Sequence, residues 1–96
     1  MKNVKKNKLK LAVMAKLKYV NIFNMELINL EIIKFCINLE NLDCHENKIT
    51  NLHGLEYCTN LQILSCQSNQ ITNLYGLKTC INLRQLFGIS FLYKNV

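Results

Sequence analysis

The sequence predicts an α/β protein in which short parallel β-strands and their return segments stack as successive coils. The first observation is a gapless repeat, because residues 37–58 and 59–80 are identical at twelve of 22 positions. The second is alternation within a copy: in residues 41–45 the apolar Leu42 and Cys44 alternate with polar side chains, as a half-buried strand requires. One such copy cannot bury its apolar side alone, so neighbouring copies must supply the core.

The composition and length of the chain exclude several other classes of protein. The chain has 96 residues, half of them apolar, which fits one globular domain rather than a disordered chain. Three glycines and no proline exclude a collagen-like triple helix. Uninterrupted apolar runs reach about five residues, whereas a membrane-spanning helix needs about twenty. We therefore expect no transmembrane segment.

Residues 1–14 form a basic N-terminal arm. Residues 1–18 carry seven lysines and no acidic residue, whereas the rest of the chain is nearly neutral. We expect the arm to be a mobile tail or a loosely held helix that covers the first coil as a crude cap. The lysines through which it would contact nucleic acid or an anionic membrane are Lys2, Lys5, Lys6, Lys8 and Lys10. No clear cleavage site follows, so we expect an intracellular, cytoplasmic protein.

The repeats occupy residues 15–96. A degenerate copy covers 15–36, two full copies cover 37–58 and 59–80, and a partial copy covers 81–96. The apolar positions predict strands near 20–22, 42–44, 64–66 and 86–88, paired in parallel about 5 Å apart. Between strands, Ile49, Leu52, Leu55 and Cys58 would fill the interior on the return path.

The shared frame, L-x-x-L-x-C-x-x-N-x-I-T-N-L-x-G-L-x-x-C, resembles the leucine-rich repeat family. Its 22-residue period is similar to the short subclass found in internalins and in a phosphatase-1 regulatory subunit. The resemblance implies a right-handed solenoid with a parallel sheet on its concave face and 3₁₀ turns or short helices on its convex face. The matching residues are Leu39, Leu42, Cys44, Asn47, Ile49, Leu52 and Leu55, and in the next copy Leu61, Leu64, Cys66, Asn69, Ile71, Leu74 and Leu77.

Asn47 and Asn69 occupy the corner after each strand, where the chain turns away from the sheet. A short amide at such a corner bonds backbone groups within and between coils. These two residues are therefore predicted to be structural.

The five cysteines fall in two columns of the repeat, and aliphatic residues replace them in other copies. We interpret them as buried, reduced thiols that act as small hydrophobes. A zinc site formed by Cys44, His45, His53 and Cys58 is the alternative, but it lacks a C-x-x-C motif. Hence we expect no metal and no cofactor.

Another position of the repeat carries charged residues on successive coils, namely Lys34, Glu56 and Lys78. Their alternating charges suggest a ladder of ion pairs on the convex side. Exposed pairs of this kind contribute about 0–1 kcal/mol each.

No glycine-rich phosphate loop, nucleophile motif or paired carboxylates appear, so we expect a non-catalytic protein. Its function would be protein–protein interaction through the outward residues of the sheet. The predicted partner-binding residues are Asn41, Asp43, His45, Ile63, Ser65, Gln67, Gln85 and Phe87.

Two alternative functions stay open: a nucleic-acid or membrane-surface binder that acts through the basic arm, and a non-functional remnant of a longer repeat array. The last copy places Phe87, Ile89, Phe91 and Leu92 where earlier copies have polar residues. We expect these apolar residues to leave an open end that self-associates or is covered.

Overall fold

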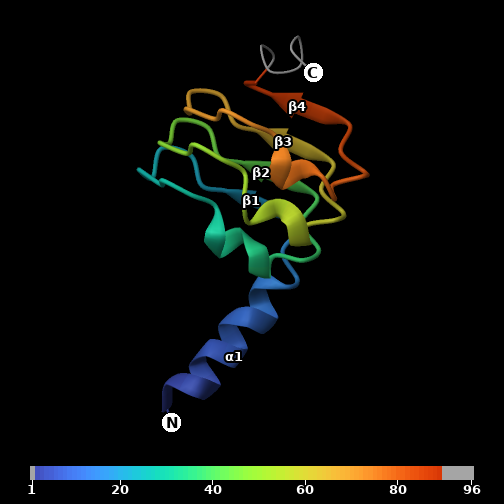
Figure 1. Cartoon of the computed structure of the whole chain (residues 1–96). Coiled ribbons are helices and arrows are strands. Elements are labelled where there is room, and N and C mark those ends of the chain that lie inside the picture. The colour runs from blue at the N-terminus through green and yellow to red at the C-terminus, as the bar shows by residue number, and fades with distance from the viewer. Residues whose placement is uncertain (1, 90–96) are drawn as a thin grey trace.

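The computed structural model describes residues 2–89 and has the predicted α/β class. One helix precedes four short strands, and a 3₁₀ helix lies between each strand and the next (Figure 1). The elements are α1 (Lys2–Met14), β1 (Tyr19–Asn21), η1 (Glu31–Phe35), β2 (Asn41–Asp43), η2 (Leu55–Tyr57), β3 (Ile63–Ser65), η3 (Tyr75–Leu77) and β4 (Gln85–Phe87). No helix within residues 2–89 is both long and apolar enough to cross a bilayer.

The four strands form one parallel sheet in the order β1-β2-β3-β4. Each strand residue pairs with the residue 22 positions later, so that Leu42 lies between Val20 and Leu64. The parallel pairing and the register are those that the repeat predicts. Each strand begins and ends one residue earlier than predicted, although Cys44 still donates its N–H to Ser65 O at 2.8 Å. The difference therefore affects only the assigned ends of the strands, not the pairing between them.

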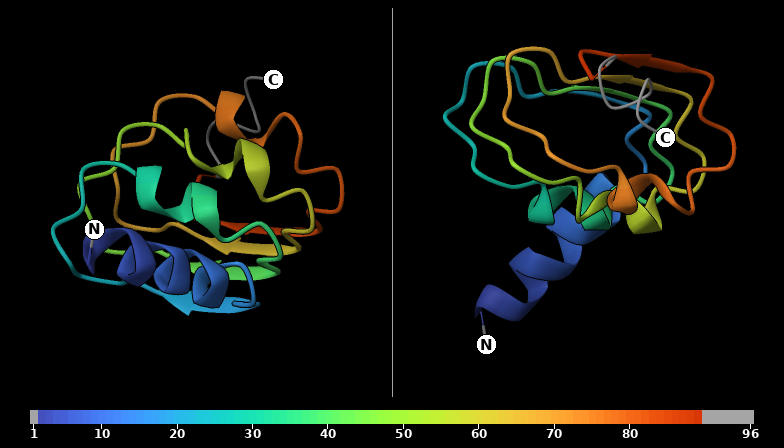
Figure 2. Two further views of the ribbon diagram at one scale, coloured as in Figure 1. Left: turned by 90° about the horizontal axis from the view of Figure 1, so that it is seen from below. Right: turned by 45° about the horizontal axis from the view of Figure 1, so that its top comes forward.

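The return segments run along the side opposite the sheet, where η1, η2 and η3 lie next to one another (Figure 2). Two glycines bring these segments close together. A β-carbon at Gly76 would overlap the carbonyl oxygen of Leu52, and one at Gly54 would overlap that of Leu30. The first copy carries Ile32 in the same column, where no coil precedes it, and Ile32 is 56% exposed. Glycine therefore occupies this position of the repeat where one coil touches the backbone of the coil before it.

Apolar side chains from every coil fill the space between the sheet and the 3₁₀ helices. Leucine and isoleucine occupy most of the inward positions, and burying each contributes about 1.5–3 kcal/mol. The largest fully buried apolar residues are Leu30, Leu39, Leu42, Ile49, Leu52, Leu55, Leu61 and Leu64. The interior is therefore one continuous cluster that crosses all the coils.

All five cysteines are buried and free, as predicted. Their thiols also make contacts that the sequence did not suggest. Cys58 Sγ donates to Cys36 O at 3.4 Å, and Cys80 Sγ donates to Leu55 O at 3.3 Å. These carbonyl groups belong to the preceding coil, so these two thiols are weak donors between coils as well as small hydrophobes.

Asn47 connects two coils at the corner after β2. Its Oδ1 accepts the N–H groups of Met25 and Leu27, both at 3.0 Å, and its Nδ2 donates to Ile22 O at 2.9 Å. Asn47 is only 7% exposed. Asn69 occupies the same position one coil later. An amide suits this corner because it is both a donor and an acceptor.

Helix α1 projects away from the stacked coils instead of lying across the first one (Figure 1). Only its end contacts the core, through Met14 and the following Leu17. Leu9 is 67% exposed and Val13 is 53% exposed. The expectation of a cap folded back over the first coil is therefore wrong for most of the helix.

The last described residues depart from the alternation that the sequence suggested. Ile89 was expected on the outward side, but it is 2% exposed and belongs to the core cluster. Gly88 precedes it with a φ of +99°, a left-handed conformation that redirects the chain after β4. Ile89 therefore enters the interior. Phe91 and Leu92, on which the predicted open end depends, lie outside the described residues.

Candidate functional site

The eight predicted partner-binding residues all come from β2, β3 and β4 or from the two residues after β2 and β3. The strand register aligns their outward positions in rows across the sheet. We call this surface the sheet face. It consists of Tyr19, Asn21, Phe23, Asn41, Asp43, His45, Ile63, Ser65, Gln67, Gln85 and Phe87.

The register defines two rows on the sheet face. One row consists of Tyr19, Asn41, Ile63 and Gln85, and the other consists of Asn21, Asp43, Ser65 and Phe87. Aromatic residues lie on the two edge strands, with Tyr19 56% exposed and Phe87 44% exposed. Ile63 and Ser65 in the middle are half-buried. The sheet face therefore has a polar centre with one aliphatic side chain, and its exposed aromatic rings lie at the edges.

His45 is fixed in place at the carboxyl end of β2. Its Nδ1 donates a hydrogen bond to the Asp43 carboxylate, because a carboxylate can only accept. On the neighbouring coil the Phe23 ring stacks on the imidazole, with 4.9 Å between centroids and 14° between planes. These contacts hold the imidazole in place on the sheet face.

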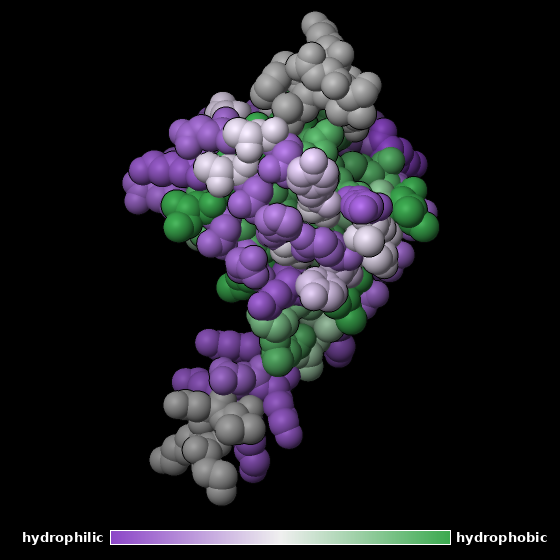
Figure 3. Space-filling view, viewed as in Figure 1, coloured by the Kyte–Doolittle hydropathy of each residue, from purple (hydrophilic) through white to green (hydrophobic). Residues whose placement is uncertain are grey.

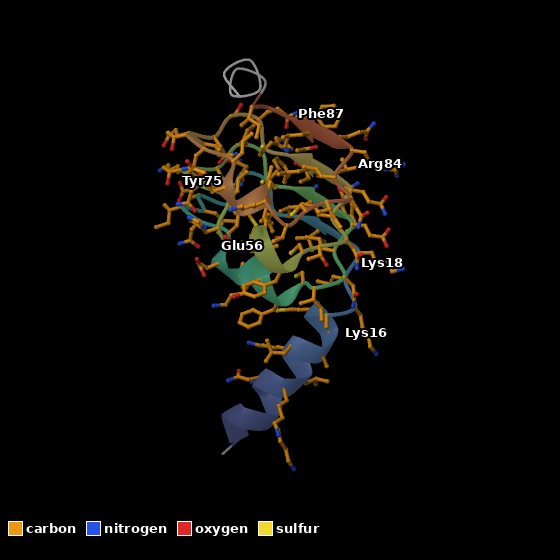
Figure 4. The ribbon with its side chains drawn as sticks, turned by 45° about the vertical axis from the view of Figure 1, so that its right-hand side comes forward. Lys16, Lys18, Glu56, Tyr75, Arg84 and Phe87 are labelled. Carbon is orange, nitrogen blue, oxygen red and sulfur yellow. The ribbon has the colours of Figure 1, made fainter. Side chains whose placement is uncertain are left out.

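A second polar row, which the sequence analysis missed, runs along the side where the strands begin. Lys18 Nζ lies 3.7 Å from Glu40 Oε2, and Arg84 Nη2 donates to Gln62 Oε1 at 2.9 Å. The four residues are each 22 positions apart, and Figure 4 shows Lys18 and Arg84 on the same side of the molecule. The repeat spacing was the signal that could have revealed this row.

The ion-pair ladder expected at Lys34, Glu56 and Lys78 does not form among the described residues. Lys34 Nζ instead pairs with Glu31 at 3.8 Å, within its own 3₁₀ helix. Glu56 accepts a hydrogen bond from His53 Nδ1 at 2.7 Å. Lys34 and Glu56 therefore each pair with a residue of their own coil instead of with a charged residue of a neighbouring coil.

Glu56 also accepts the N–H of Gly54 at 2.7 Å, at the start of η2. Partial burial raises the pKa of Glu56, but the hydrogen bonds from His53 and Gly54 outweigh it, so its pKa lies below the usual value. The carboxylate of Glu56 thus bonds only partners of its own coil among the hydrogen bonds of the described residues.

The lysines of the basic arm do form part of a helix. Lys5, Lys6, Lys8 and Lys10 are exposed along α1, and Lys2 begins it. Helix α1 contains no acidic residue. These lysines come from a different element than the sheet face, so the two candidate binding regions are separate.

The donors of the alternative zinc site do not converge. Within residues 2–89 no three His, Cys, Asp or Glu side chains lie close enough together to hold a metal ion. His45 and His53 are each bonded to a carboxylate. Burial raises the pKa of the Cys44 and Cys58 thiols to about 12, so both are protonated at neutral pH.

No protein-family model matches this sequence, and no curated protein matches it.

Proposed function

We propose that the chain is a right-handed leucine-rich-repeat solenoid with the sheet face on its concave side. Three observations support this architecture. Parallel strands pair at a spacing of 22 residues, and a 3₁₀ helix lies between each strand and the next along the chain. In addition, the side chains of Asn47 and Asn69 bond the preceding coil at the corners after the strands. In such a fold each coil is buried by its neighbours.

We further propose that this protein is a non-catalytic interaction module that binds another protein through the sheet face. The observation that carries the proposal is that exposed Tyr19 and Phe87, on the two edge strands of one sheet, flank a largely polar centre. Aromatic side chains are the commonest anchors of protein interfaces, and they need polar neighbours to fix the register of the partner.

The size of the sheet face limits the kind of partner. Three strand spacings of about 4.8 Å make it about 14 Å wide, and the four residue steps from the first to the last outward position of a copy make it about 13 Å long. That footprint is far below the roughly 800 Å² per partner of a standard interface. We infer that one helix or one loop of the partner lies on the sheet face, with Lys18 and Arg84 contacting its flank.

The second candidate function is binding of nucleic acid or an anionic membrane through α1. The observation that favours it is the run of exposed Lys5, Lys6, Lys8 and Lys10 without an acidic neighbour in the helix. Binding to phosphate groups weakens steeply as salt rises.

Affinity capture with variants of the full chain separates the two functions. The sheet-face variant is Phe87→Ser, and its matched control is Tyr75→Ser, on η3 at the opposite side of the molecule. If the sheet face binds, Phe87→Ser loses a captured protein that Tyr75→Ser and a chain without residues 1–10 both retain. Loss of the captured protein only on deletion of residues 1–10 would show that the basic arm, not the sheet face, contacts it and would contradict the sheet-face proposal.

A further inference from the structure

A groove separates α1 from the first 3₁₀ helix, away from the sheet face. Its volume is about 300 Å³, and its lining residues are Asn7, Lys10, Leu11, Met14, Ile32 and Phe35. Leu11 is 41% exposed, Ile32 is 56% exposed and Phe35 is 39% exposed. Figure 3 shows hydrophobic side chains gathered where α1 joins the coils, with hydrophilic ones along the helix below them. The groove thus has an apolar floor in contact with solvent.

The α1 side of this groove is cationic, because Lys10 lies there. On the η1 side Lys34 Nζ lies 5.3 Å from the centroid of the Phe35 ring, but it is paired with Glu31 at 3.8 Å. The surrounding sequence is strongly basic, since residues 5–18 contain six lysines and no acidic residue. An occupant with carboxylates beside its apolar side chains would complement both the floor and the cationic α1 side.

We propose that this groove binds an acidic amphipathic segment of a partner protein, with an apolar side chain inserted between Leu11 and Ile32. The volume is at the lower limit of ligand pockets and accommodates one or two apolar side chains. Carboxylates of the segment pair with Lys10 and with its lysine neighbours on α1. This site is separate from the sheet face and does not depend on it.

A protein segment fits the groove better than the other anionic partners do. Leu11 and Met14 line it together with Ile32 and Phe35, so these two apolar residues of α1 are turned toward η1. A planar bilayer cannot enter a groove between two elements, whereas a side chain can. Nucleic acid would be held by phosphate contacts to lysine and would gain little from an aliphatic floor.

The test uses the full chain and a fluorescein-labelled helical peptide of glutamate and leucine, with leucines at i, i+3, i+4 and i+7. Fluorescence anisotropy measures its Kd for the unchanged protein and for Ile32→Asn. The matched control is Ile81→Asn, because Ile81 is also exposed but lies on a distant coil. We expect Ile32→Asn to weaken binding about tenfold or more and Ile81→Asn to leave it unchanged. Urea midpoints show whether each variant is folded.

Further probes identify the chemistry of the occupant. A peptide with serine in place of leucine should bind at least about tenfold more weakly, and one with lysine in place of glutamate should not bind. The proposal is overturned if the glutamate–leucine peptide shows no binding at about 1 mM protein. It is also overturned if Ile32→Asn and Ile81→Asn have equal effects, or if phosphatidylserine vesicles or a DNA oligonucleotide bind more tightly than the peptide and are insensitive to Ile32→Asn.

Discussion

Asn69 shows how one side chain can hold two coils together. Its Oδ1 accepts the N–H of Ile49 at 3.0 Å, and its Nδ2 donates to Cys44 O at 3.0 Å and to Cys66 O at 3.2 Å. Removing the amide leaves these backbone groups without their partner. Such a loss costs about 1–3 kcal/mol.

We therefore predict that Asn69→Ala lowers the free energy of unfolding by about 1–3 kcal/mol. The control is Ser68→Ala, because Ser68 is exposed and both serine and alanine must adopt its φ of +58°. Urea denaturation of the two variants measures the difference. Equal midpoints would show that the corner amide does not stabilise the stacking of the coils.

The buried thiols give a second prediction at the scale of the residue. Burial raises the pKa of Cys44, Cys58 and Cys66 to about 12. At pH 8 their thiolate fraction is then about a thousandth of that of a free thiol, and only the thiolate reacts. We expect thiol labelling at pH 8 to be very slow in the native protein and fast in urea. Rapid native labelling of these three residues would contradict their burial.

At the scale of the element, the close approach of the return segments depends on glycine. A β-carbon at Gly76 would overlap the backbone of Leu52. We predict that Gly76→Ala destabilises the protein by about 2 kcal/mol or more, because a packed contact must open. In the same column of the first copy, Ile32→Ala should have little effect on stability. Thermal unfolding of both variants tests this contrast, and a tolerated Gly76→Ala would mean that the coils lie further apart.

The basic helix and the coils should be separable in stability. Helix α1 contacts the core only through its end, at Met14, and Asn38 Nδ2 donates to Ala15 O at 2.7 Å just beyond it. We predict that deleting residues 1–10 leaves the urea midpoint nearly unchanged. Deleting residues 1–17 removes Met14 and Leu17 and should cost about 1–3 kcal/mol. A large loss from the shorter deletion would show that the helix stabilises the whole fold.

Across the whole molecule, the repeat made most of the architecture predictable. The 22-residue spacing predicted the strand register, the inward leucines and the buried cysteines, because stacked coils place equivalent residues side by side. The sequence did not reveal local choices between partners of similar energy. Glu56 bonds His53 within its own coil instead of a lysine on the next one. At the end of the sheet, one left-handed glycine, Gly88, overrides the alternation and sends Ile89 inward.

The placement of the candidate site on one sheet was predictable for the same reason. All eight residues predicted to bind a partner lie on this sheet or directly after its strands, because they occupy equivalent positions of the repeat. The stacking of Phe23 on His45 and the groove beside α1 were not predictable. Both depend on how elements of different copies, or of the arm and a coil, meet in space. Neither arrangement leaves a periodic signal in the sequence.

The central claim is that the sheet face, not another side of the molecule, contacts the partner protein. Photo-crosslinking tests it most directly, with p-benzoylphenylalanine placed at Ser65 on the sheet face or at Tyr75, which is 73% exposed on η3. In cells of the source organism, we predict one discrete crosslinked protein from the Ser65 position and none from the Tyr75 position. The same crosslinked protein from both positions, or from the Tyr75 position alone, would contradict the claim.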